Sequence, residues 1–418
     1  MILGVDVASI ARIEQALQRH PRFADRIFTA AEQRYCGAKA ERWASRWAAK
    51  EAVRKLYGSA RAYPLPWMHE IEVVRGGGAP RLRVRGADTS IALTLTHDAG
   101  VAIAVVAAES LADATVRLTA PPGMVLAARP DDGNKGTFGR VVVVAGARGF
   151  TGAPQLAALG AARGGAGLVT LCVADGIYPI VAGRMLEVMP APLPDSGTGT
   201  LTSEGLDAVR EHAQGASALV IGPGLGRAPA TVDAVLTILR TLPCPTVVDA
   251  DGLNIAAASD FDWHQAPHPV VLTPHPAEMA RLLHSDTQSV QRDRQTVAVQ
   301  FARERNVVLV LKGAETVIAA PDGRVHVDSH RVVALASGGT GDVLAGLLGS
   351  MLAQGLDPFD AAVAAVTVHA NAGLLVEARR GRAGAIASDV IDALPEAQER
   401  LRRAIQRDAG ARQGDYRS

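Results

Sequence analysis

Most of the chain beyond residue 140 repeats one pattern, a short apolar run rich in β-branched residues followed by a longer stretch with helical spacing. The runs lie at residues 141–144, 167–173, 218–221, 246–249, 270–273 and 307–311. Each is apolar on both faces, which is typical of strands inside a parallel sheet covered by helices. The pattern predicts a three-layer α/β domain with a mostly parallel sheet, whose ligands bind beyond the carboxyl ends of the strands.

The first 110 residues or so follow a different pattern. An apolar strand opens at Ile2, a helical stretch covers residues 40–57 before Gly58, and strands at 91–97 and 101–107 close the segment. A glycine just after the last helical residue is a common helix C-cap. Because these strands are mostly neighbours in sequence, we expect a small α+β domain.

Loop-forming residues separate the two patterns, among them Pro121, Pro122 and Gly123. A chain of 418 residues exceeds the usual size of one domain. We therefore predict a first domain at 1–112, a linker at 113–125, a second domain at 126–405 and a tail at 406–418.

Composition narrows the possible functions. A formal net charge of +1 argues against a dedicated nucleic-acid binder. Cys36, Cys172 and Cys244 lie far apart and lack metal-ligand spacing, so we expect buried thiols in a reducing compartment. The N-terminus lacks the features of a secretory signal, and no uninterrupted apolar run of about 18 residues occurs. We expect a cytoplasmic protein without a membrane span.

Two acidic residues of the first domain are candidates for a metal site. Asp6 ends an apolar strand, where a carboxylate is costly unless it is paired or binds a cation. Glu51 and Lys55 lie four residues apart on one face of the predicted helix. On spacing alone, an ordinary Glu–Lys pair on a surface helix is the favoured interpretation of these two residues.

Three segments of the first domain, in order and spacing, resemble holo-acyl-carrier-protein synthases. The first segment is 5–7 together with Ile10, Arg12 and Ile13. The second is 46–55 and the third is 95–98. The resemblance implies transfer of 4′-phosphopantetheine from coenzyme A to a serine of an acyl carrier protein, a step of fatty acid biosynthesis. It departs from the family at 7–9, where an acidic or larger residue is common.

The resemblance also assigns roles to residues of the first domain. Asp6 and Glu51 match the Mg²⁺ ligands, and Arg46, Lys55 and His97 match positions that bind coenzyme A and its phosphates. The family also implies a homo-oligomer. A basic surface that suits an acidic carrier protein is offered by Arg12, Arg19, Arg22 and Arg26. A solvated helix face explains these arginines equally well.

A glycine-rich loop at 336–341 is the sharpest feature of the second domain. Its small residues allow a ligand to approach the backbone, and the N–H groups at the start of the following apolar helix form a ready anion site. Asp342 falls in the first turn of that helix. By itself, Asp342 is either a helix cap or a catalytic base.

This loop resembles the anion hole and catalytic aspartate of ribokinase-like enzymes. Five further segments narrow the resemblance to ADP-dependent NAD(P)H-hydrate dehydratases: 134–146, 222–226, 249–254, 271–282 and 312–316. The resemblance runs from about residue 126 to 395 and includes these six segments in order. The resemblance implies that the S form of NADHX or NADPHX, a hydrated nicotinamide cofactor, is dehydrated to NADH or NADPH while ADP becomes AMP and phosphate.

The resemblance implies two binding sites around Asp342, the general base. The nucleotide residues are Lys312, Gly313, Ala314, Glu315, Thr316, Ser337, Gly338, Gly339, Thr340 and Gly341, with Mg²⁺ on the nucleotide. The NAD(P)HX residues are Gly226, His275 and Asp342. His275 also fits a simple helix cap, and His369 and Asn371 fit packing positions on an alanine-rich helix. Departures from the family occur at 332–334 and at Ala277.

Two alternative functions remain open at this point. The second domain also fits a kinase for a vitamin precursor, because the glycine loop is common to ribokinase-like enzymes. The first domain also fits a non-catalytic oligomerisation module.

Overall fold

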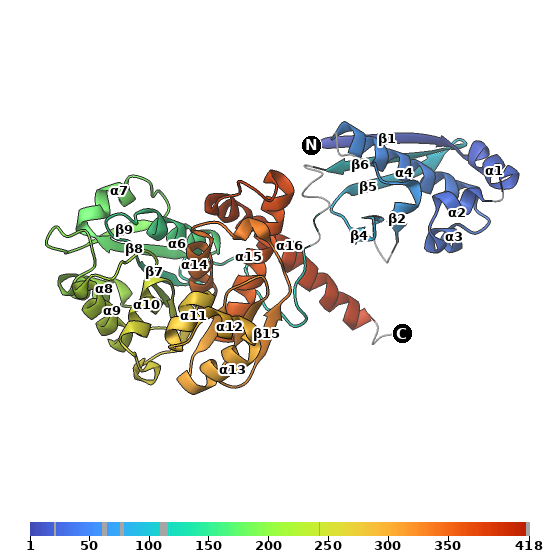
Figure 1. Cartoon of the computed structure of the whole chain (residues 1–418). Helices are drawn as coiled ribbons and strands as arrows, with labels where there is room; N and C mark the ends of the chain where they lie inside the picture. Colours follow the sequence, from blue (N-terminus) through green and yellow to red (C-terminus); the bar gives the residue numbers. More distant parts are fainter. Residues whose placement is uncertain are drawn as a thin grey trace. The chain divides into compact units, whose positions relative to one another are not determined.

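The computed structural model describes residues 1–20, 22–60, 65–75, 79–108, 116, 118–241 and 243–414, with side chains described up to residue 406. The chain divides into two compact units, Met1–Arg117 and Leu118–Ser418 (Figure 1). Each unit has a hydrophobic core of its own.

The first unit combines two small antiparallel sheets with four described helices, as the α+β expectation requires. One sheet has the order β1 (Ile2–Ser9), β6 (Val101–Ala108), β5 (Ala92–Asp98), and the other β2 (Ile71–Val74), β3 (Arg81–Val84), β4 (Ala87–Asp88). The helices are α1 (Ile10–Arg19), α2 (Phe23–Ile27), α3 (Ala30–Cys36) and α4 (Ala40–Ser59).

Helix α4 lies against one face of the β1–β6–β5 sheet. Gly4 permits this approach, because a Cβ atom there would lie 2.0 Å from the carbonyl oxygen of Ala52. A buried ion pair also anchors α4, since Lys50 Nζ lies 2.7 Å from Glu32 Oε2, and Glu32 Oε1 accepts a hydrogen bond of 3.0 Å from the N–H of Val73. These contacts join α3, α4 and β2, and they fix the helix that carries Glu51.

The second unit is built on a nine-stranded sheet, and the predicted mostly parallel three-layer fold is confirmed. In sheet order the strands are β15 (Val325–Asp328), β14 (Thr316–Ala319), β13 (Val308–Leu311), β12 (Val270–Leu272), β11 (Thr246–Val248), β10 (Ala218–Ile221), β7 (Arg140–Val144), β8 (Leu168–Ala174) and β9 (Met189–Leu193). From β9 to β13 all neighbours are parallel, whereas β14 pairs antiparallel with both β13 and β15.

Helices cover both faces of this sheet (Figure 1). One layer contains α6 (Gly152–Arg163), α14 (Thr340–Ala353), α15 (Pro358–Arg380) and α16 (Ala387–Gly414). The remaining helices are α7 (Tyr178–Ala182), α8 (Leu206–Ala213), α9 (Pro229–Thr241), α10 (Asp251–Ala258), α11 (Pro276–Leu282), α12 (Thr287–Arg292) and α13 (Arg294–Arg305). Glycines bring α6 and α14 into direct contact, because a Cβ atom at Gly346 would lie 1.8 Å from the carbonyl oxygen of Ala157.

The strand order reverses beside β7. The chain leaves β7 for β8 and β9 on one side and returns to β10 on the other, so the loops that follow β7 and β10 separate at this point. The two loops are joined where the N–H of Gly146 donates to the carbonyl oxygen of Pro223, at 2.8 Å. Such switch points are where open α/β sheets bind ligands.

The division at Arg117 places residues 118–125, part of the expected linker, in the second unit. Thr119 explains this placement. Its N–H donates to Asn371 Oδ1 at 3.0 Å, and its carbonyl oxygen accepts from Asn371 Nδ2 at 2.9 Å. At the other end, α16 continues to Gly414, beyond the expected start of the tail at 406.

One helix of the described residues, α15, is long and apolar enough to cross a bilayer by length and composition alone. However, 89% of its most apolar 18-residue window is buried inside the protein. The helix therefore has the burial of a core helix of the second unit.

Candidate active sites

The acidic pair of the first unit lies at the contact between β1 and α4. Lys55 Nζ lies 2.8 Å from Asp6 Oδ1 and 3.0 Å from the carbonyl oxygen of Val5. Glu51 is one turn before Lys55 on α4, and its Oε1 atom lies 3.3 Å from Arg54 NH1. The structure thus joins Asp6 to Lys55 at the strand–helix contact, with Glu51 one turn away on α4.

Two carboxylates in this position suit a hard cation that keeps several water ligands, as Mg²⁺ does. Both side chains are partly exposed, Asp6 by 14% and Glu51 by 26%, so water and phosphate can reach them. Within the described residues, no cluster of three or more His, Cys, Asp or Glu side chains forms a closed metal site.

Glu51 also lines a cavity of about 770 Å³ between α1, α2 and α4 and the segment at 67–69. Its other lining residues are mainly basic and aromatic: His20, Arg22, Phe23, Arg26, Ile27, Trp47, Arg54, Trp67, Met68 and His69. Of the four arginines that suggested a basic docking surface, Arg22 and Arg26 belong to this cavity, and Arg12 and Arg19 do not line it.

Arg46 and His97, the other predicted coenzyme A residues, lie elsewhere on the first unit. Arg46 is only 3% exposed, and its Cζ atom stacks 4.1 Å above the ring of Tyr35. His97 is exposed near the end of β5 and is separated from β1 by strand β6. Among the described residues, no hydrogen bond or ion pair connects either side chain to Asp6 or Glu51.

In the second unit, three polar residues follow directly after neighbouring parallel strands. Asp249 follows β11, Thr273 follows β12 and Lys312 follows β13, so the sheet brings them to one edge. Asp249 Oδ1 lies 2.8 Å from Lys312 Nζ and accepts a hydrogen bond of 2.8 Å from Thr273 Oγ1. Burial alone would lower the pKa of Lys312, but Asp249 and Glu278 outweigh it and raise that pKa, so Lys312 stays cationic.

Asp342 faces this cluster from the first turn of α14. Burial raises the pKa of Asp342 to about 7, and the charges of Asp249 and Glu278 add to this effect while Lys312 opposes it. The helix N-cap is Gly339, which has no side-chain cap, and Asp342 is the third helical residue. The position therefore favours a proton-transfer role over capping, because a group with a pKa near 7 exchanges protons readily at neutral pH.

The glycine loop turns sharply in front of Asp342. Gly339 has φ +89°, and a Cβ atom there would lie 2.4 Å from Leu156 Cδ1, so only glycine fits. The Thr340 hydroxyl lies 2.7 Å from the carbonyl oxygen of Leu335 and 2.9 Å from that of Ser337, which holds the turn. Lys312 Nζ lies close to Gly341, since a Cβ atom on Gly341 would be 3.4 Å from it. Cation and helix N-terminus thus converge on one anion-binding position.

The predicted NAD(P)HX residues hold loops at the same sheet edge. The N–H of Gly226 donates to Asp251 Oδ2 at 2.9 Å, which joins the loops after β10 and β11. His275 caps α11, because its Nδ1 atom accepts from the N–H groups of Ala277 and Glu278 at 3.1 and 3.2 Å. Burial, helped by Lys312 and Arg281, lowers the pKa of His275, so the ring is neutral and half-exposed. The other ring nitrogen, Nε2, lies 3.4 Å from Glu278 Oε1.

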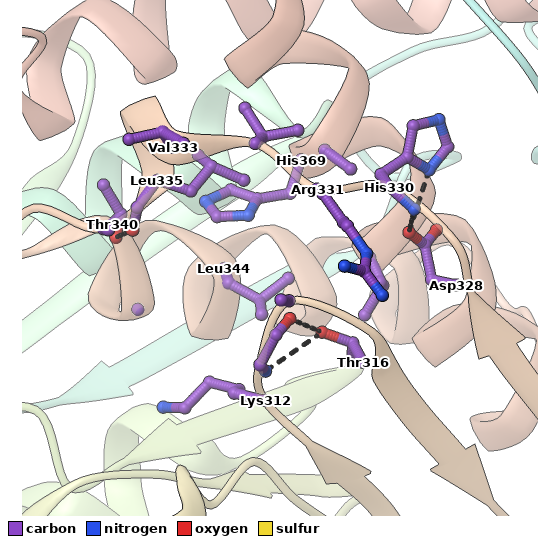
Figure 2. Close-up of a pocket in the computed structure, with 17 residues that line it drawn as sticks. Lys312, Thr316, Asp328, His330, Arg331, Val333, Leu335, Thr340, Leu344 and His369 are labelled. Atoms are coloured by element: carbon purple, nitrogen blue, oxygen red, sulfur yellow. Dashed lines mark hydrogen bonds and ion pairs between the residues drawn. The ribbon is translucent and has the colours of Figure 1, made fainter. Parts of the chain in front are cut away.

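A cavity of about 410 Å³ opens beside the glycine loop (Figure 2). Six of the predicted nucleotide residues line it: Lys312, Gly313, Ala314, Thr316, Thr340 and Gly341. Glu315 is turned to Arg331, with 2.5 Å between Glu315 Oε1 and Arg331 NH2. Ser337, Gly338 and Gly339 do not line the cavity; Ser337 and Gly339 shape the turn next to it.

Several cavity residues were absent from the predicted site. Strand β15 contributes its last residue, Asp328. The segment after it contributes His330, Arg331, Val332 and Val333, and α15 contributes Val366, His369 and Ala370. The polar run at 328–331 just before the glycine loop was an available signal. The sequence indicates His369 less clearly, because its helix has the composition of a core helix. In the structure, His369 is buried and also lines the cavity.

Arg294 of α13 holds the predicted nucleotide loop through hydrogen bonds to its backbone. Its NH2 atom donates to the carbonyl oxygens of Leu311 and Lys312, at 2.8 and 3.1 Å. Nothing in the local sequence indicates this role, because the partners are backbone atoms of a distant strand. Arg294 therefore belongs to the site as a positioning residue.

Two family models match the chain. One, described as NAD(P)H-hydrate dehydratase, matches residues 141–396, and one for the 4′-phosphopantetheinyl transferase superfamily matches residues 2–106. These matches confirm both resemblances that the motifs indicate.

Individual relatives agree with the larger match. A bifunctional NAD(P)H-hydrate repair enzyme of Moorella thermoacetica is 43% identical over 279 residues, which is 66% of this chain and 52% of the relative. An ADP-dependent (S)-NAD(P)H-hydrate dehydratase of Neisseria meningitidis is 34% identical over 67% of this chain and 92% of its own length. The chain spans about half the length of the bifunctional relatives it matches.

A solved structure supports the same assignment. The ADP/ATP-dependent NAD(P)H-hydrate dehydratase of Bacillus subtilis, co-crystallised with ATP and Mg²⁺, is 31% identical and superposes with a TM-score of 0.58. The superposition covers 66% of this chain and 94% of that one. The chain therefore belongs to the NAD(P)H-hydrate dehydratase family, and its first unit matches the 4′-phosphopantetheinyl transferase superfamily.

Proposed function

We propose that the second unit dehydrates (S)-NADHX and (S)-NADPHX to NADH and NADPH, with ADP converted to AMP and phosphate. One observation carries the proposal. Asp342, whose pKa is raised to about 7, stands in the first turn of α14 beside a cavity lined by Lys312 and Gly341. This places a proton acceptor next to an anion-binding position, which a phosphoryl transfer to a hydroxyl group requires.

The chemistry follows from the poor leaving ability of hydroxide. Asp342 accepts the proton of the substrate hydroxyl. The hydroxyl oxygen attacks the terminal phosphorus of ADP, and AMP departs. The lone pair of the ring nitrogen then expels phosphate, and loss of a ring proton restores the dihydronicotinamide. Asp342 thus serves the first step, in which a hydroxyl becomes a phosphate ester.

The anion-binding position supplies the stabilisation for that step. Lys312 Nζ and the N–H groups at the start of α14 face the charge that develops on the moving phosphoryl group. Asp249 keeps Lys312 in place through the contact of 2.8 Å. A Mg²⁺ ion carried on the nucleotide phosphates would neutralise further charge there.

The test of this activity is optical. With (S)-NADHX, ADP and Mg²⁺, the full chain is expected to restore the absorbance of reduced nicotinamide, and omission of ADP is the control. A vitamin-precursor kinase would phosphorylate a thiazole or pyrimidine alcohol and leave this absorbance unchanged. Absence of recovery together with such phosphorylation would replace the proposal with the kinase.

We propose that the first unit transfers 4′-phosphopantetheine from coenzyme A to a serine of an acyl carrier protein. Asp6 and Glu51 would hold Mg²⁺, which supplies charge neutralisation on the pyrophosphate, and Lys55 would bind a phosphate from the exposed side of the site. The basic and aromatic cavity beside Glu51 fits an acidic carrier, because Arg22, Arg26 and Arg54 offer complementary charge.

A homo-oligomer is part of this proposal. Leu3, Val5 and Val7 are all about half exposed on the face of the sheet that turns away from α4. An apolar sheet face of this kind is normally covered. A second copy of the chain would cover it.

Mass spectrometry tests the transferase. An apo acyl carrier protein incubated with coenzyme A, Mg²⁺ and the full chain should gain the phosphopantetheine arm, and Glu51→Gln should slow the gain by about 10²-fold or more, as expected for loss of a metal ligand. Arg81→Gln, an exposed change on β3, is the control. No modification of several carriers would support the oligomerisation module instead.

A further inference from the structure

Two imidazole rings line the cavity beside the glycine loop, and the protein satisfies them differently. His330 has both nitrogens engaged: Nδ1 lies 2.8 Å from Asp328 Oδ1 and Nε2 lies 2.9 Å from Thr119 Oγ1. His330 therefore has no nitrogen left for a ligand. It contributes a fixed wall, held from behind by the first residues of the second unit.

His369 is the opposite case. Its side chain lines the same cavity and the residue is only 7% exposed, yet its Nε2 atom is buried without a hydrogen-bond partner among the described residues. Burial lowers the pKa of His369 to about 4, so the ring is neutral at physiological pH. Burying a polar atom without a partner is unfavourable, which calls for a compensating role.

The surroundings of His369 do not need a polar residue. Val366, His369 and Ala370 share one face of α15 and all line the cavity, whose other apolar lining residues include Val332, Val333 and Leu344. An aliphatic side chain would pack equally well in such a wall. The imidazole is therefore better explained by what enters the cavity than by the packing of the helix.

The cavity has a polar end and an apolar end. Lys312 and Gly341 mark the anion-binding end, and the valines of 332–333 with Val366 mark the apolar end. Figure 2 shows the His369 ring beside Leu335 and Thr340, and Lys312 on a separate loop, after β13. A nucleotide with one phosphate at Lys312 would therefore meet His369 with another part of the molecule.

We propose that His369 is a nucleotide-recognition residue whose Nε2 atom hydrogen-bonds to the nucleoside part of ADP. The inference rests on the nucleotide site proposed above and adds a residue that selects the nucleoside. The buried Nε2 atom of His369 then gains its hydrogen-bond partner when the nucleotide binds.

Calorimetric titration of the full chain with ADP and with AMP tests the inference without any turnover. His369→Leu removes the hydrogen bond, His369→Asn places an amide nitrogen near the Nδ1 position, and His369→Gln reaches the Nε2 position. We expect His369→Leu and His369→Asn to weaken ADP and AMP equally, by about tenfold, the effect of one hydrogen bond. His369→Gln should bind within about threefold of the wild type.

Thermal unfolding without nucleotide separates recognition from packing. If Nε2 awaits a ligand, His369→Leu should be at least as stable as the wild type before nucleotide is added and should gain less stability from ADP. A packing residue would give the reverse, a less stable variant with unchanged ADP affinity. His326→Leu is the matched control, because His326 lies on β15, is partly buried and does not line the cavity.

The outcomes distinguish the inference from the proposed function. If the wild type binds ADP and all three variants bind it equally, His369 has no recognition role and the nucleotide site stands. If the wild type binds neither ADP nor AMP, the nucleotide site itself is wrong and the inference falls with it.

Discussion

At the scale of single residues, the second unit concentrates acidic groups around one cation. Asp249, Glu278 and Asp342 surround Lys312, and burial raises the pKa of both Glu278 and Asp342 to about 7. Groups that influence each other titrate together, so the observed pKa values belong to the cluster. The cluster keeps Asp342 able to accept a proton at neutral pH while Lys312 remains charged.

The pH dependence of dehydration tests this electrostatic picture. Asp342 works as a base only when ionised, so kcat/KM should fall as the pH drops through about 7, the raised pKa. Glu278→Gln should move this fall to lower pH, because the Glu278 carboxylate helps to raise the pKa of Asp342. A rate that is flat between about pH 5 and 8 would contradict the assignment.

The same shift has a stability consequence. An aspartate whose pKa is raised on folding makes the folded state bind protons more tightly, so its contribution to stability is lost as the pH rises from the unfolded value of about 4 to 7. Asp342→Asn removes this contribution. We expect the variant to be at least as stable as the wild type in urea unfolding at about pH 8, above the raised pKa, and a clearly less stable variant would show that Asp342 is structural.

At the scale of elements, the close contact of α6 and α14 positions the catalytic helix. Gly346→Ala would bring a Cβ atom within 1.8 Å of the Ala157 carbonyl oxygen, so the helices must separate. We expect a loss of about 1–3 kcal/mol in unfolding free energy, the usual cost of overpacking. Gly152→Ala in the first turn of α6 is the control, because a Cβ atom at that position would have no other atom within 4 Å. Equal stability of the two variants would contradict the role of the contact.

Much of the second unit was predictable from the pattern of apolar residues. The run at 218–221 coincides with β10, and those at 141–144 and 307–311 differ from β7 and β13 by one residue. Strands β9, β14 and β15 were not predicted. Two prolines in β9 hide its strand pattern, and β14 and β15 form a short antiparallel hairpin at the sheet edge, where continuous apolar runs are not required.

The site residues that directly follow a predicted strand could be predicted from the sequence. Asp249 and Lys312 come directly after apolar runs, so the rule for parallel sheets places them at the ligand edge. His330 follows an edge strand that the pattern missed, and His369 lies on a helix that reads as core. Their place in the cavity depends on how α15 packs against the β15 side of the sheet, which local sequence does not encode.

At the scale of the whole molecule, the boundary between the units is set by contacts and not by composition. Asn371 is fully buried and its amide bonds to the backbone of Thr119 from both ends. A fragment that begins at residue 126 leaves Asn371 Oδ1 without its partner and leaves Nδ2 with the carbonyl oxygen of Thr367 alone, whereas a fragment that begins at Leu118 retains both contacts with Thr119. The prolines of 121–122 are therefore part of the second unit.

Unfolding in urea compares the two fragments directly. We expect the fragment from residue 126 to be less stable by about 1–3 kcal/mol, the cost of leaving a buried polar group unsatisfied. Asn371→Leu should reduce the difference in unfolding free energy between the two fragments, because the apolar side chain needs no hydrogen-bond partner. Identical midpoints for both fragments would place the boundary nearer to residue 126.

The central claim is that Asp342 is the base of an ADP-driven dehydration. The most direct measurement is the recovery of reduced-nicotinamide absorbance from (S)-NADHX, with ADP and Mg²⁺, by the wild type and by Asp342→Asn. We predict that the variant binds ADP as the wild type does and loses about 10²–10⁴-fold in rate, as expected for a missing general base. A folded variant that dehydrates (S)-NADHX at nearly the wild-type rate would contradict the claim.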